Sequence, residues 1–396
     1  MKSLFFVGML VAGTALAQRV PWTLETTSIS STGAGDPTFM FVPNTTLNGV
    51  QLIVGTDKLQ LGVYFWVPGA FPQIVGPGQV NGADSRGSLL VATNAGGSLL
   101  AFDVSDAGVV TQLDTGMFTV PSPKYVALAK NRDGGFEVWV DTSSNVIEHL
   151  AMSAIKDGGV TFTSLPSITV PEPPAGLAVD DRNGRLYVSQ RTLGVLTVDR
   201  GGAPSFLISV DAGHLGLDVG GIDLFLEADG GVLVFTAAPT EVELKVHSVA
   251  GALATYRATL QIGMTDGGPQ LGQPRHLDVY EQPVPGFPKG VLIVQDELAA
   301  NYKLVSLAAL DAVFPLPPPY LPGGAPPAIV DAGTDGGADA GTPDGGFTDA
   351  GAGVFTGHNP GPAPGVDPTP SCGCTGGPFT VLPALLLLWW IRRRSP

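Results

Sequence analysis

Short apolar segments recur in pairs through residues 52–307 and indicate the fold. Six times an apolar strand is followed by a small polar break and a second apolar strand. The first strands begin at Leu52, Leu89, Phe136, Leu186, Val232 and Val291, and their partners begin at Gly62, Leu99, Val146, Val195, Leu244 and Tyr302. The pairs recur roughly every 48 residues, the length of a propeller blade. Four-stranded blades around a central channel bury their faces against their neighbours. We therefore predict an all-β, six-bladed β-propeller over residues 25–314.

Two other all-β architectures share this alternation of strands and turns. A two-sheet sandwich and an irregular β-solenoid also consist of short strands bounded by turn residues. The strand pattern over residues 25–314 is long for one sandwich, and helical periodicity is almost absent from it. In a propeller, function is expected on the loops and at the central mouth of the domain. A closed ring needs no partner to protect its strand edges, so we expect a monomer.

The N-terminus is typical of a secretory signal peptide, predicted over residues 1–17. Lys2 supplies the charged region, Leu4–Val11 the apolar region, and Ala15-Leu16-Ala17 a cleavage site for signal peptidase. A membrane-spanning helix needs about 20 apolar residues, and this run is shorter. We therefore expect the protein to be exported.

The composition changes abruptly after the predicted propeller, and residues 315–370 are interpreted as a linker. Pro315–Pro322 favours extended polyproline II structure. Residues 331–353 repeat Asp-Ala-Gly and Asp-Gly-Gly units, which have almost no apolar surface to bury and predict a disordered spacer. A calcium-binding β-roll is the alternative, but the repeat lacks the apolar position that each turn of a β-roll requires.

Residues 371–396 form a second targeting segment. Ser371–Cys374 (SCGC) precede the apolar run Phe379–Ile391, which three arginines follow. Such cations stay on the cytoplasmic side of a membrane. The tail resembles the MYXO-CTERM signals of myxobacteria. This resemblance implies cleavage by a myxosortase-like protease, attachment through Cys372 or Cys374, and a position at the cell surface, associated with the outer membrane. A vicinal disulfide or a free thiol pair is the alternative for the two cysteines.

The charge of the chain excludes some partners and favours others. Its formal net charge is −15, with only 14% charged residues. Nucleic-acid binding requires a basic surface, so we expect no nucleic-acid partner. Clustered carboxylates suit calcium. The body has no cysteine, its histidines show no ligand spacing, and no G-x-S-x-G, Walker or H-E-x-x-H motif is present.

Charged residues stand at the mouths of the first two predicted blades. Asp36 precedes a proline at a strand entrance, Lys58 lies on the turn after the strand LIVG, and Arg86 lies on the connection into the second blade. A carboxylate can bind a metal, while lysine and arginine bind phosphate oxygens. The three residues therefore predict a site for a phosphorylated ligand and a metal.

The body resembles the β-propeller phytases. The segments that carry the resemblance are GDPTFMFV (from Gly35), IVGTDK, LGVYFW, NGADSR (from Asn81), AGLAVDDRNGRLYVSQ (Ala175–Gln190), DVGGIDLF (Asp218–Phe225) and GVLIVQDELAANYKLVSL (Gly290–Leu307). Each segment is weak evidence alone, but together they follow the family's order over essentially the whole body. Members of this family are six-bladed, calcium-dependent enzymes that hydrolyse inositol hexakisphosphate.

The resemblance implies a residue set for the site. Asp36, Asp218 and Asp278 would be calcium ligands, Asp278 being the acid that is retained in the segment GQPRHLD. Lys58 and Arg86 would bind the phosphate of a small molecule such as an inositol phosphate. Calcium in this family polarises the phosphoryl group and activates the attacking water.

The chain departs from the family at several acidic positions. Gly35, Ala175 and Gly220 stand where the family has acids, and Arg275 stands near a carboxylate position. Each lost carboxylate weakens calcium binding, so we expect fewer calcium ions than in the family. Asp180 and Asp181, in the turn DDRNGR, are predicted to lie outside the site.

Two functions stay open. One is a calcium-dependent phosphatase acting on phytate-like substrates. The other is a catalytically decayed propeller that serves as a surface binding or adhesion module, since a fold does not determine a function. Under the second hypothesis, Arg275 would replace a metal by pairing with Asp36 or Asp218. A lactonase-like or sugar-dehydrogenase-like propeller is less favoured, because the matched motifs belong to the phytases.

Overall fold

A computed structural model of the chain describes residues 18–21, 24–25, 37–42, 50–56, 61–65, 73–75, 80–116, 118–130, 135–142, 144–210, 214–216, 218–263 and 270–320. The chain divides into two compact units, Met1–Asp331 and Ala332–Pro396, and every described residue belongs to the first. The predicted signal peptide, the repetitive part of the predicted linker and the predicted sorting tail lie outside the described residues.

The described strands form six sheets. The first three sheets, in chain order, use strands β3 to β14. The first contains β3 (Thr38–Val42), β4 (Val50–Thr56), β5 (Leu61–Phe65) and β6 (Gln73–Val75). The second contains β7 (Val80–Arg86), β8 (Leu89–Asn94), β9 (Leu99–Val104) and β10 (Val110–Leu113). The third contains β11 (Val126–Lys130), β12 (Phe136–Asp141), β13 (Val146–Met152) and β14 (Phe162–Thr169).

The other three sheets include two strands from the N-terminus. The fourth contains β15 (Pro174–Asp180), β16 (Arg185–Gln190), β17 (Gly194–Val198) and β18 (Ser205–Ser209). The fifth contains β19 (Ile222–Leu226), β20 (Val232–Ala238), β21 (Glu243–Ala250), β22 (Leu253–Ile262) and β1 (Gln18–Val20). The sixth contains β23 (Pro274–Tyr280), β24 (Val291–Asp296), β25 (Asn301–Ser306) and β2 (Leu24–Glu25).

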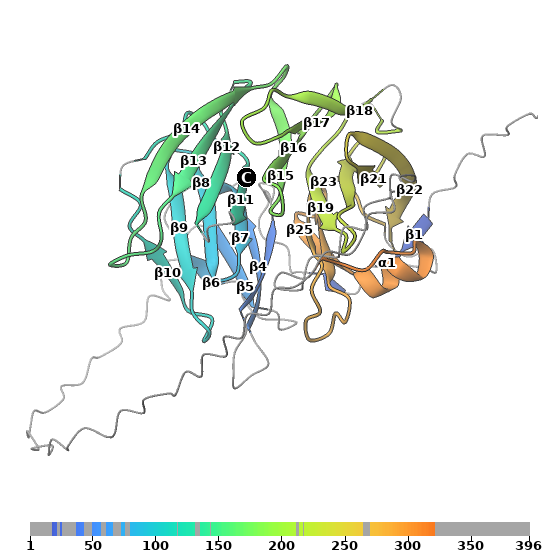
Figure 1. Ribbon diagram of the computed structural model, residues 1–396. Coiled ribbons are helices and arrows are strands. Elements are labelled where there is room, and N and C mark those ends of the chain that lie inside the picture. The colour runs from blue at the N-terminus through green and yellow to red at the C-terminus, as the bar shows by residue number, and fades with distance from the viewer. Residues whose placement is uncertain are drawn as a thin grey trace, which may run out of the picture. The chain divides into compact units, whose positions relative to one another are not determined.

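The sheets are arranged as in a β-propeller, which confirms the predicted all-β propeller fold (Figure 1). The first strand of each sheet is innermost, and β3, β7, β11, β15, β19 and β23 each contact the next, with β23 meeting β3. Buried apolar side chains fill five of the interfaces between neighbouring sheets. Full burial of one large apolar side chain contributes about 1.5–3 kcal/mol, so these interfaces hold the ring together.

The six predicted strand pairs are the second and third strands of the six sheets, and all six pairs are antiparallel. These strands are covered on both faces, so nearly every residue is apolar and they stand out in the sequence. β20, for example, is buried along its whole length. The outer strands β14 and β18 are largely exposed and carry no such signal, which is why the sequence did not reveal them.

Both ends of the propeller extend beyond the predicted bounds 25–314. β2 pairs with β25 and completes the last sheet, while β1 runs parallel to β22. At the other end, the helix α1 (Leu307–Val313) follows β25, with Ser306 as its N-cap. We call residues 314–320 the C-terminal strap. Strands of two and three residues are too short to leave a periodic pattern, which explains why the bounds were too narrow.

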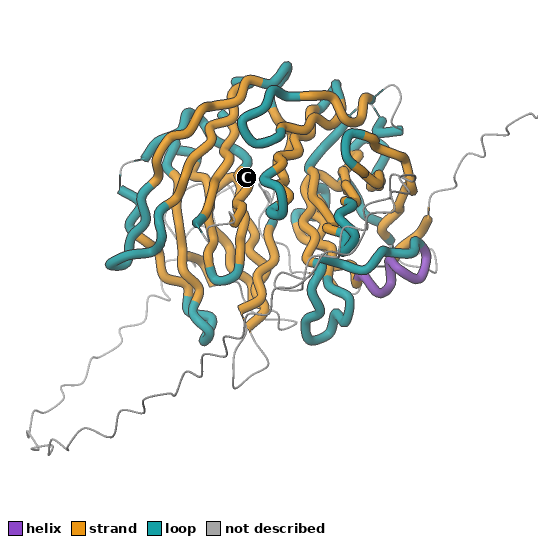
Figure 2. The backbone as a smooth tube through the Cα atoms, in the orientation of Figure 1, coloured by secondary structure: helices purple, strands orange, loops and turns teal. Residues whose placement is uncertain are grey.

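The C-terminal strap belongs to the propeller, although its prolines predicted a free linker from residue 315. The Ala228 N–H donates to the Pro318 carbonyl (2.8 Å), and the Tyr320 N–H donates to the Leu226 carbonyl (2.7 Å). The strap thus pairs with the turn after β19. Figure 2 shows α1 as a short helix beside the strands. Among the described residues, no helix is long and apolar enough to cross a membrane.

Neighbouring innermost strands run in the same direction. β19 and β23 meet near their starts, where the Gly221 N–H donates to the Arg275 carbonyl (2.6 Å). They also meet at their ends, where the Leu226 N–H donates to Glu281 Oε1 (3.1 Å). We call the side on which innermost strands begin the start face; it includes Asp218 and Arg275. The side on which they end is the end face; it includes Arg86, Asp181 and Glu281.

Candidate functional site

The predicted phosphate-binding residue Arg86 lies within a group of acids at the end of β7. Its Nε donates to Asp181 Oδ2 (2.9 Å), and its Nη1 donates to Asp84 Oδ1 (3.0 Å). The Arg86 side chain is 30% exposed. The guanidinium therefore bridges two innermost strands and is already engaged by two carboxylates of the protein.

Carboxylates of this group also hold backbone N–H groups of the next innermost strand. Asp84 Oδ2 accepts a hydrogen bond from the Leu128 N–H on β11 (2.7 Å). Asp223 Oδ2 accepts one from the Val279 N–H on β23 (2.5 Å). The two acids thus connect adjacent sheets near the centre of the ring.

We define the central ion cluster by the groups that interact electrostatically around Arg86, namely Arg86, Asp84, Asp181, Asp223, Asp278 and Glu281. Burial acts against the charge of Arg86, but Asp181, Asp84 and the other carboxylates outweigh it and raise its pKa. The cluster contains five carboxyl groups and one guanidinium, so its fully ionised form carries a large negative excess.

Protons compensate part of that excess. Burial raises the pKa of Asp84 and of Asp181 in spite of Arg86. Burial, and then the neighbouring Asp278 carboxylate, raise the pKa of Asp223 well above its ordinary value. Burial also raises the pKa of Glu281 to about 7. The cluster therefore keeps part of its carboxyl groups protonated near neutral pH.

Asp218, a predicted calcium ligand, is paired elsewhere. Arg191 Nε lies 2.7 Å from Asp218 Oδ1, and Thr240 Oγ1 donates to Asp218 Oδ2 (3.1 Å). Arg191 directly follows Gln190, which is the partner of Pro174, the first residue of β15. Asp218 thus lies at the start face, in contact with a cation.

Asp218 and Arg86 lie at opposite ends of β15, so the structure does not unite them in one site. Asp218 is near the first residue of that strand, whereas Asp181, the partner of Arg86, follows its last residue. A strand rises about 3.3 Å per residue, which places roughly 20 Å between the two ends of β15. The predicted site is therefore divided between the two faces.

Of the other predicted site residues, only Asp278 can be placed. It lies on β23 and acts on both Arg86 and Asp223, so it belongs to the central ion cluster. Asp36, Lys58, Cys372 and Cys374 lie outside the described residues. Among the described His, Cys, Asp and Glu residues, no three are grouped as ligands of a single metal ion.

The expected pairing of Arg275 with Asp218 is wrong. Arg275 Nε lies 2.6 Å from Glu297 Oε2, because Glu297 follows β24, the strand that pairs with the one carrying Arg275. Gly220, which stands where the phytases have an acid, has no space for a side chain. A Cβ there would lie 2.8 Å from the Arg275 carbonyl oxygen. A carboxylate ligand at position 220 is thus sterically excluded.

Asp181, which was predicted to lie outside the site, contacts the predicted phosphate-binding residue Arg86. The missed signal is a repeat across blades. Asp84, Asp223 and Asp278 stand two or three residues before the last paired residue of their innermost strands. Superposing the predicted blades by their hairpins would have revealed this row of acids.

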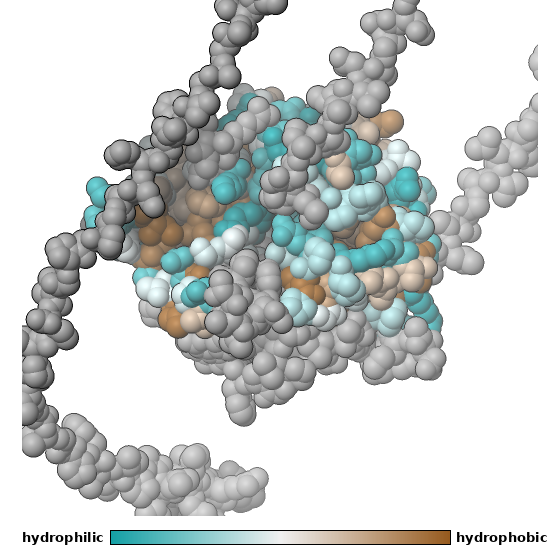
Figure 3. Space-filling model, turned by 60° about the horizontal axis from the view of Figure 1, so that its bottom comes forward, coloured by the Kyte–Doolittle hydropathy of each residue, from teal (hydrophilic) through white to brown (hydrophobic). Residues whose placement is uncertain are grey.

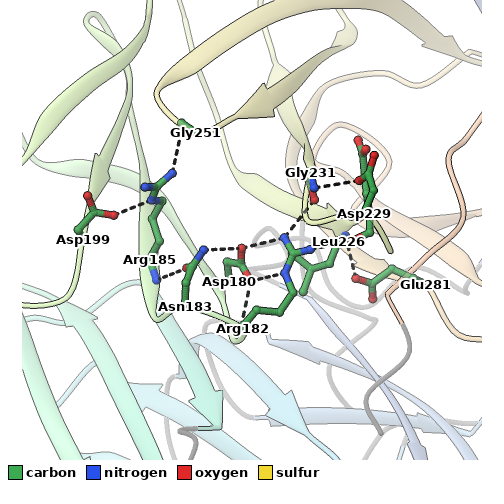
Figure 4. A network of polar contacts seen from close by, with 11 residues as sticks. Asp180, Arg182, Asn183, Arg185, Asp199, Leu226, Asp229, Gly231, Gly251 and Glu281 are labelled. Atoms are coloured by element: carbon green, nitrogen blue, oxygen red, sulfur yellow. Dashed lines mark hydrogen bonds and ion pairs between the residues drawn. The ribbon is translucent and has the colours of Figure 1, made fainter. Parts of the chain in front are cut away.

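A second polar network joins the fourth and fifth sheets at the end face (Figure 4). The Arg182 guanidinium donates to both oxygens of Asp180 (2.9 Å each), to the Glu227 carbonyl (2.7 Å) and to the Gly231 carbonyl (3.0 Å). It also lies 5.6 Å from the ring centroid of Tyr320 in the C-terminal strap. The guanidinium thus donates four hydrogen bonds within the protein.

Comparison with known proteins gives no family assignment. No family model matches the chain, and no curated protein matches it. Two similar solved structures are crystals of BBS1N in complex with ARL6DN, soaked with mercury and with lead. They are 11% and 12% identical to this chain with a TM-score of 0.40 each, and the match covers 65% of this chain and 75% and 77% of theirs. Function must therefore be argued from the residues.

Proposed function

We propose that this chain is an exported, phytase-like phosphatase that depends on calcium and acts on a phosphorylated small molecule such as an inositol phosphate. The observation that carries the proposal is the place of the phytase-like segments. The segments that begin at Gly35, Asn81, Ala175 and Asp218 supply the innermost strands β3, β7, β15 and β19. Four of the seven segments that carry the resemblance therefore occupy equivalent positions around the ring.

We also infer that the ring has six blades. Six sheets and the contact of β23 with β3 support this count. The substrate phosphate is assigned to the start face. Asp218 lies there, as do the end of β4 and the beginning of β5, the strands that precede and follow Lys58 in the sequence. Arg86 is left out of phosphate binding, because two carboxylates already engage it.

The central ion cluster suits a calcium ion better than the surroundings of Asp218 do. At Asp218 a calcium ion would have to displace Arg191 from Oδ1. In the central ion cluster, five carboxyl groups face one guanidinium, and carboxylate oxygens are the ligands that calcium prefers. Asp278 and Asp223 would hold an ion there and it would neutralise their charge, whereas a calcium ion that polarises the substrate phosphate would have to lie at the start face, beside Asp218.

The proposal is tested by phosphate release from phytate and from an aryl phosphate. The full chain is assayed with calcium and then with a chelator. We expect calcium-dependent release that Lys58→Ala lowers at least tenfold, because a charged hydrogen bond to phosphate is lost. Lys156→Ala, at an exposed lysine between β13 and β14, is the matched control and should leave release unchanged.

The second candidate is a surface binding module without turnover. It is favoured by the neutralisation of Asp218 by Arg191 and of Arg275 by Glu297, which leaves these start-face charges little capacity for a metal or a phosphate. Absence of phosphate release, together with an unchanged melting temperature on addition of calcium, would rule out the phosphatase and support this candidate.

The localisation is proposed from the chain ends. Signal peptidase would remove residues 1–17, and a myxosortase-like protease would cut the tail and leave the protein at the cell surface. Replacing Cys372 and Cys374 by serine should abolish surface labelling of intact cells, while the chain accumulates with its tail uncut. Ser371→Ala is the control. Normal surface labelling of the double serine variant would contradict an attachment role for these cysteines.

A further inference from the structure

The end face contains a hollow of about 250 Å³ between the third and fourth sheets. Residues from the end of β11, the start of β12, the turn after β15 and the turn after β17 line it. Its charged lining consists of Lys130, Arg182, Arg200, Glu137 and Asp181. The volume suits a small molecule, and the lining carries three cations in a chain whose net charge is −15.

One wall of this hollow is held rigidly. Glu137 is 5% exposed, and its Oε2 lies 3.0 Å from His149 Nε2. The Trp139 indole stacks on the His149 ring, with centroids 4.5 Å apart and planes 10° apart. Arg200 Nη2 forms an ion pair with Glu137 Oε1. Both oxygens of Glu137 are therefore occupied, and its charge is balanced by Arg200.

When each charged residue of the lining is paired with its nearest opposite charge, one cation has no partner among the described residues. Arg182 is matched by Asp180, and Asp181 is matched by Arg86. Lys130, at the exposed end of β11, forms no ion pair with any described residue. The Arg200 side chain is 51% exposed, and its guanidinium has further N–H groups beyond the one that meets Glu137. Lys130 and Arg200 can therefore bind an anion together.

We propose that this hollow is a binding site for a small anion, a phosphate- or carboxylate-bearing molecule held by Lys130 and Arg200. The planar guanidinium suits an oxyanion, and the lysine adds a point charge. An acidic protein repels anions over most of its surface, so a locally positive hollow selects where they bind. The site lies on the end face, whereas the proposed substrate phosphate lies on the start face. It does not depend on the proposed phosphatase activity.

Titration calorimetry with inorganic phosphate, and separately with acetate, tests the proposal on the full chain. We expect saturable binding that Lys130→Gln weakens about tenfold, because one charged hydrogen bond is lost. Since Lys130 is exposed, its replacement leaves the fold intact. Arg200→Gln should act in the same direction, and Lys156→Gln, outside the hollow, should have no effect. Tighter binding of phosphate indicates a phosphate-bearing ligand, and tighter binding of acetate indicates a carboxylate.

Two results would overturn the proposal. One is the absence of saturable binding of either anion. The other is binding that Lys130→Gln and Lys156→Gln weaken equally, since this would mean a diffuse response to net charge. Because the assay measures binding and not phosphate release, its outcome is independent of whether the chain is a phosphatase.

Discussion

Replacing Arg86 by alanine is expected to lower the free energy of unfolding by about 2–3 kcal/mol, a value between those of exposed and buried ion pairs. The guanidinium is 30% exposed and joins two innermost strands through Asp84 and Asp181. Without it, the carboxylates of the central ion cluster repel one another. Urea denaturation at pH 7 measures the change. Arg86→Lys keeps the positive charge but cannot bind both carboxylates at once, so its free energy of unfolding should lie between those of the wild type and Arg86→Ala.

The same variant has a predicted pH dependence. The pKa of Glu281 is raised to about 7 in the folded protein, so the folded state holds this proton more tightly than the unfolded chain does. Stability from this group is fully present below the pKa of the unfolded chain and is lost as the pH rises through about 7. The loss of unfolding free energy caused by Arg86→Ala should therefore be smaller at pH 5, where bound protons neutralise carboxylates that Arg86 no longer neutralises.

The alternative outcome is equally specific. If Arg86→Ala unfolds like the wild type at both pH values but loses phosphate release, Arg86 is a substrate ligand, as its position in the sequence predicted. If stability falls while the remaining folded protein keeps its activity, Arg86 is a structural cation of the ring.

The central strands of each blade were predictable because burial on both faces makes them continuously apolar. The runs at Leu89 and Val291 show this pattern, and both lie in β-strands whose residues are almost all buried. The short closing strands were not predictable, because two or three residues have no periodicity. The strap was misread because its prolines favour extended structure, whether that structure is free or paired with a turn.

The candidate site was predicted less well than the fold, for a geometric reason. Residues near the beginning and near the end of an innermost strand are close in the sequence but lie on opposite faces. Asp84 and Arg86 therefore belong to the same sequence motif as the residues that begin β7, but they lie towards the opposite face of the ring. The ion pairs of Asp218 and Arg275 are also invisible in the sequence, since Arg191 and Glu297 come from neighbouring strand ends. The surface gives no further guide, because hydrophilic and apolar residues are intermixed on the side shown in Figure 3.

Replacing Arg182 by alanine is expected to have the largest effect on stability, about 3–5 kcal/mol, because it leaves a buried carboxylate without its cation. The Asp180 side chain is only 1% exposed, and it loses both hydrogen bonds from the guanidinium. The carbonyls of Glu227 and Gly231 lose their donor as well. Urea denaturation measures the loss, and proteolysis near Tyr320 should be faster because the contact with the strap is gone.

Arg185 provides the matched control, since it lies in the same turn but pairs with Asp199, which is 70% exposed. Arg185→Ala should cost no more than about 1 kcal/mol, as is usual for exposed ion pairs. Equal unfolding midpoints for Arg182→Ala and Arg185→Ala would contradict a structural role for Arg182 and leave it available for a ligand of the neighbouring hollow. A large difference would mean that one guanidinium fastens the fourth sheet, the fifth sheet and the C-terminal strap together. The residues around the hollow and the central ion cluster would then be held in place by this hydrogen-bond network at the end face.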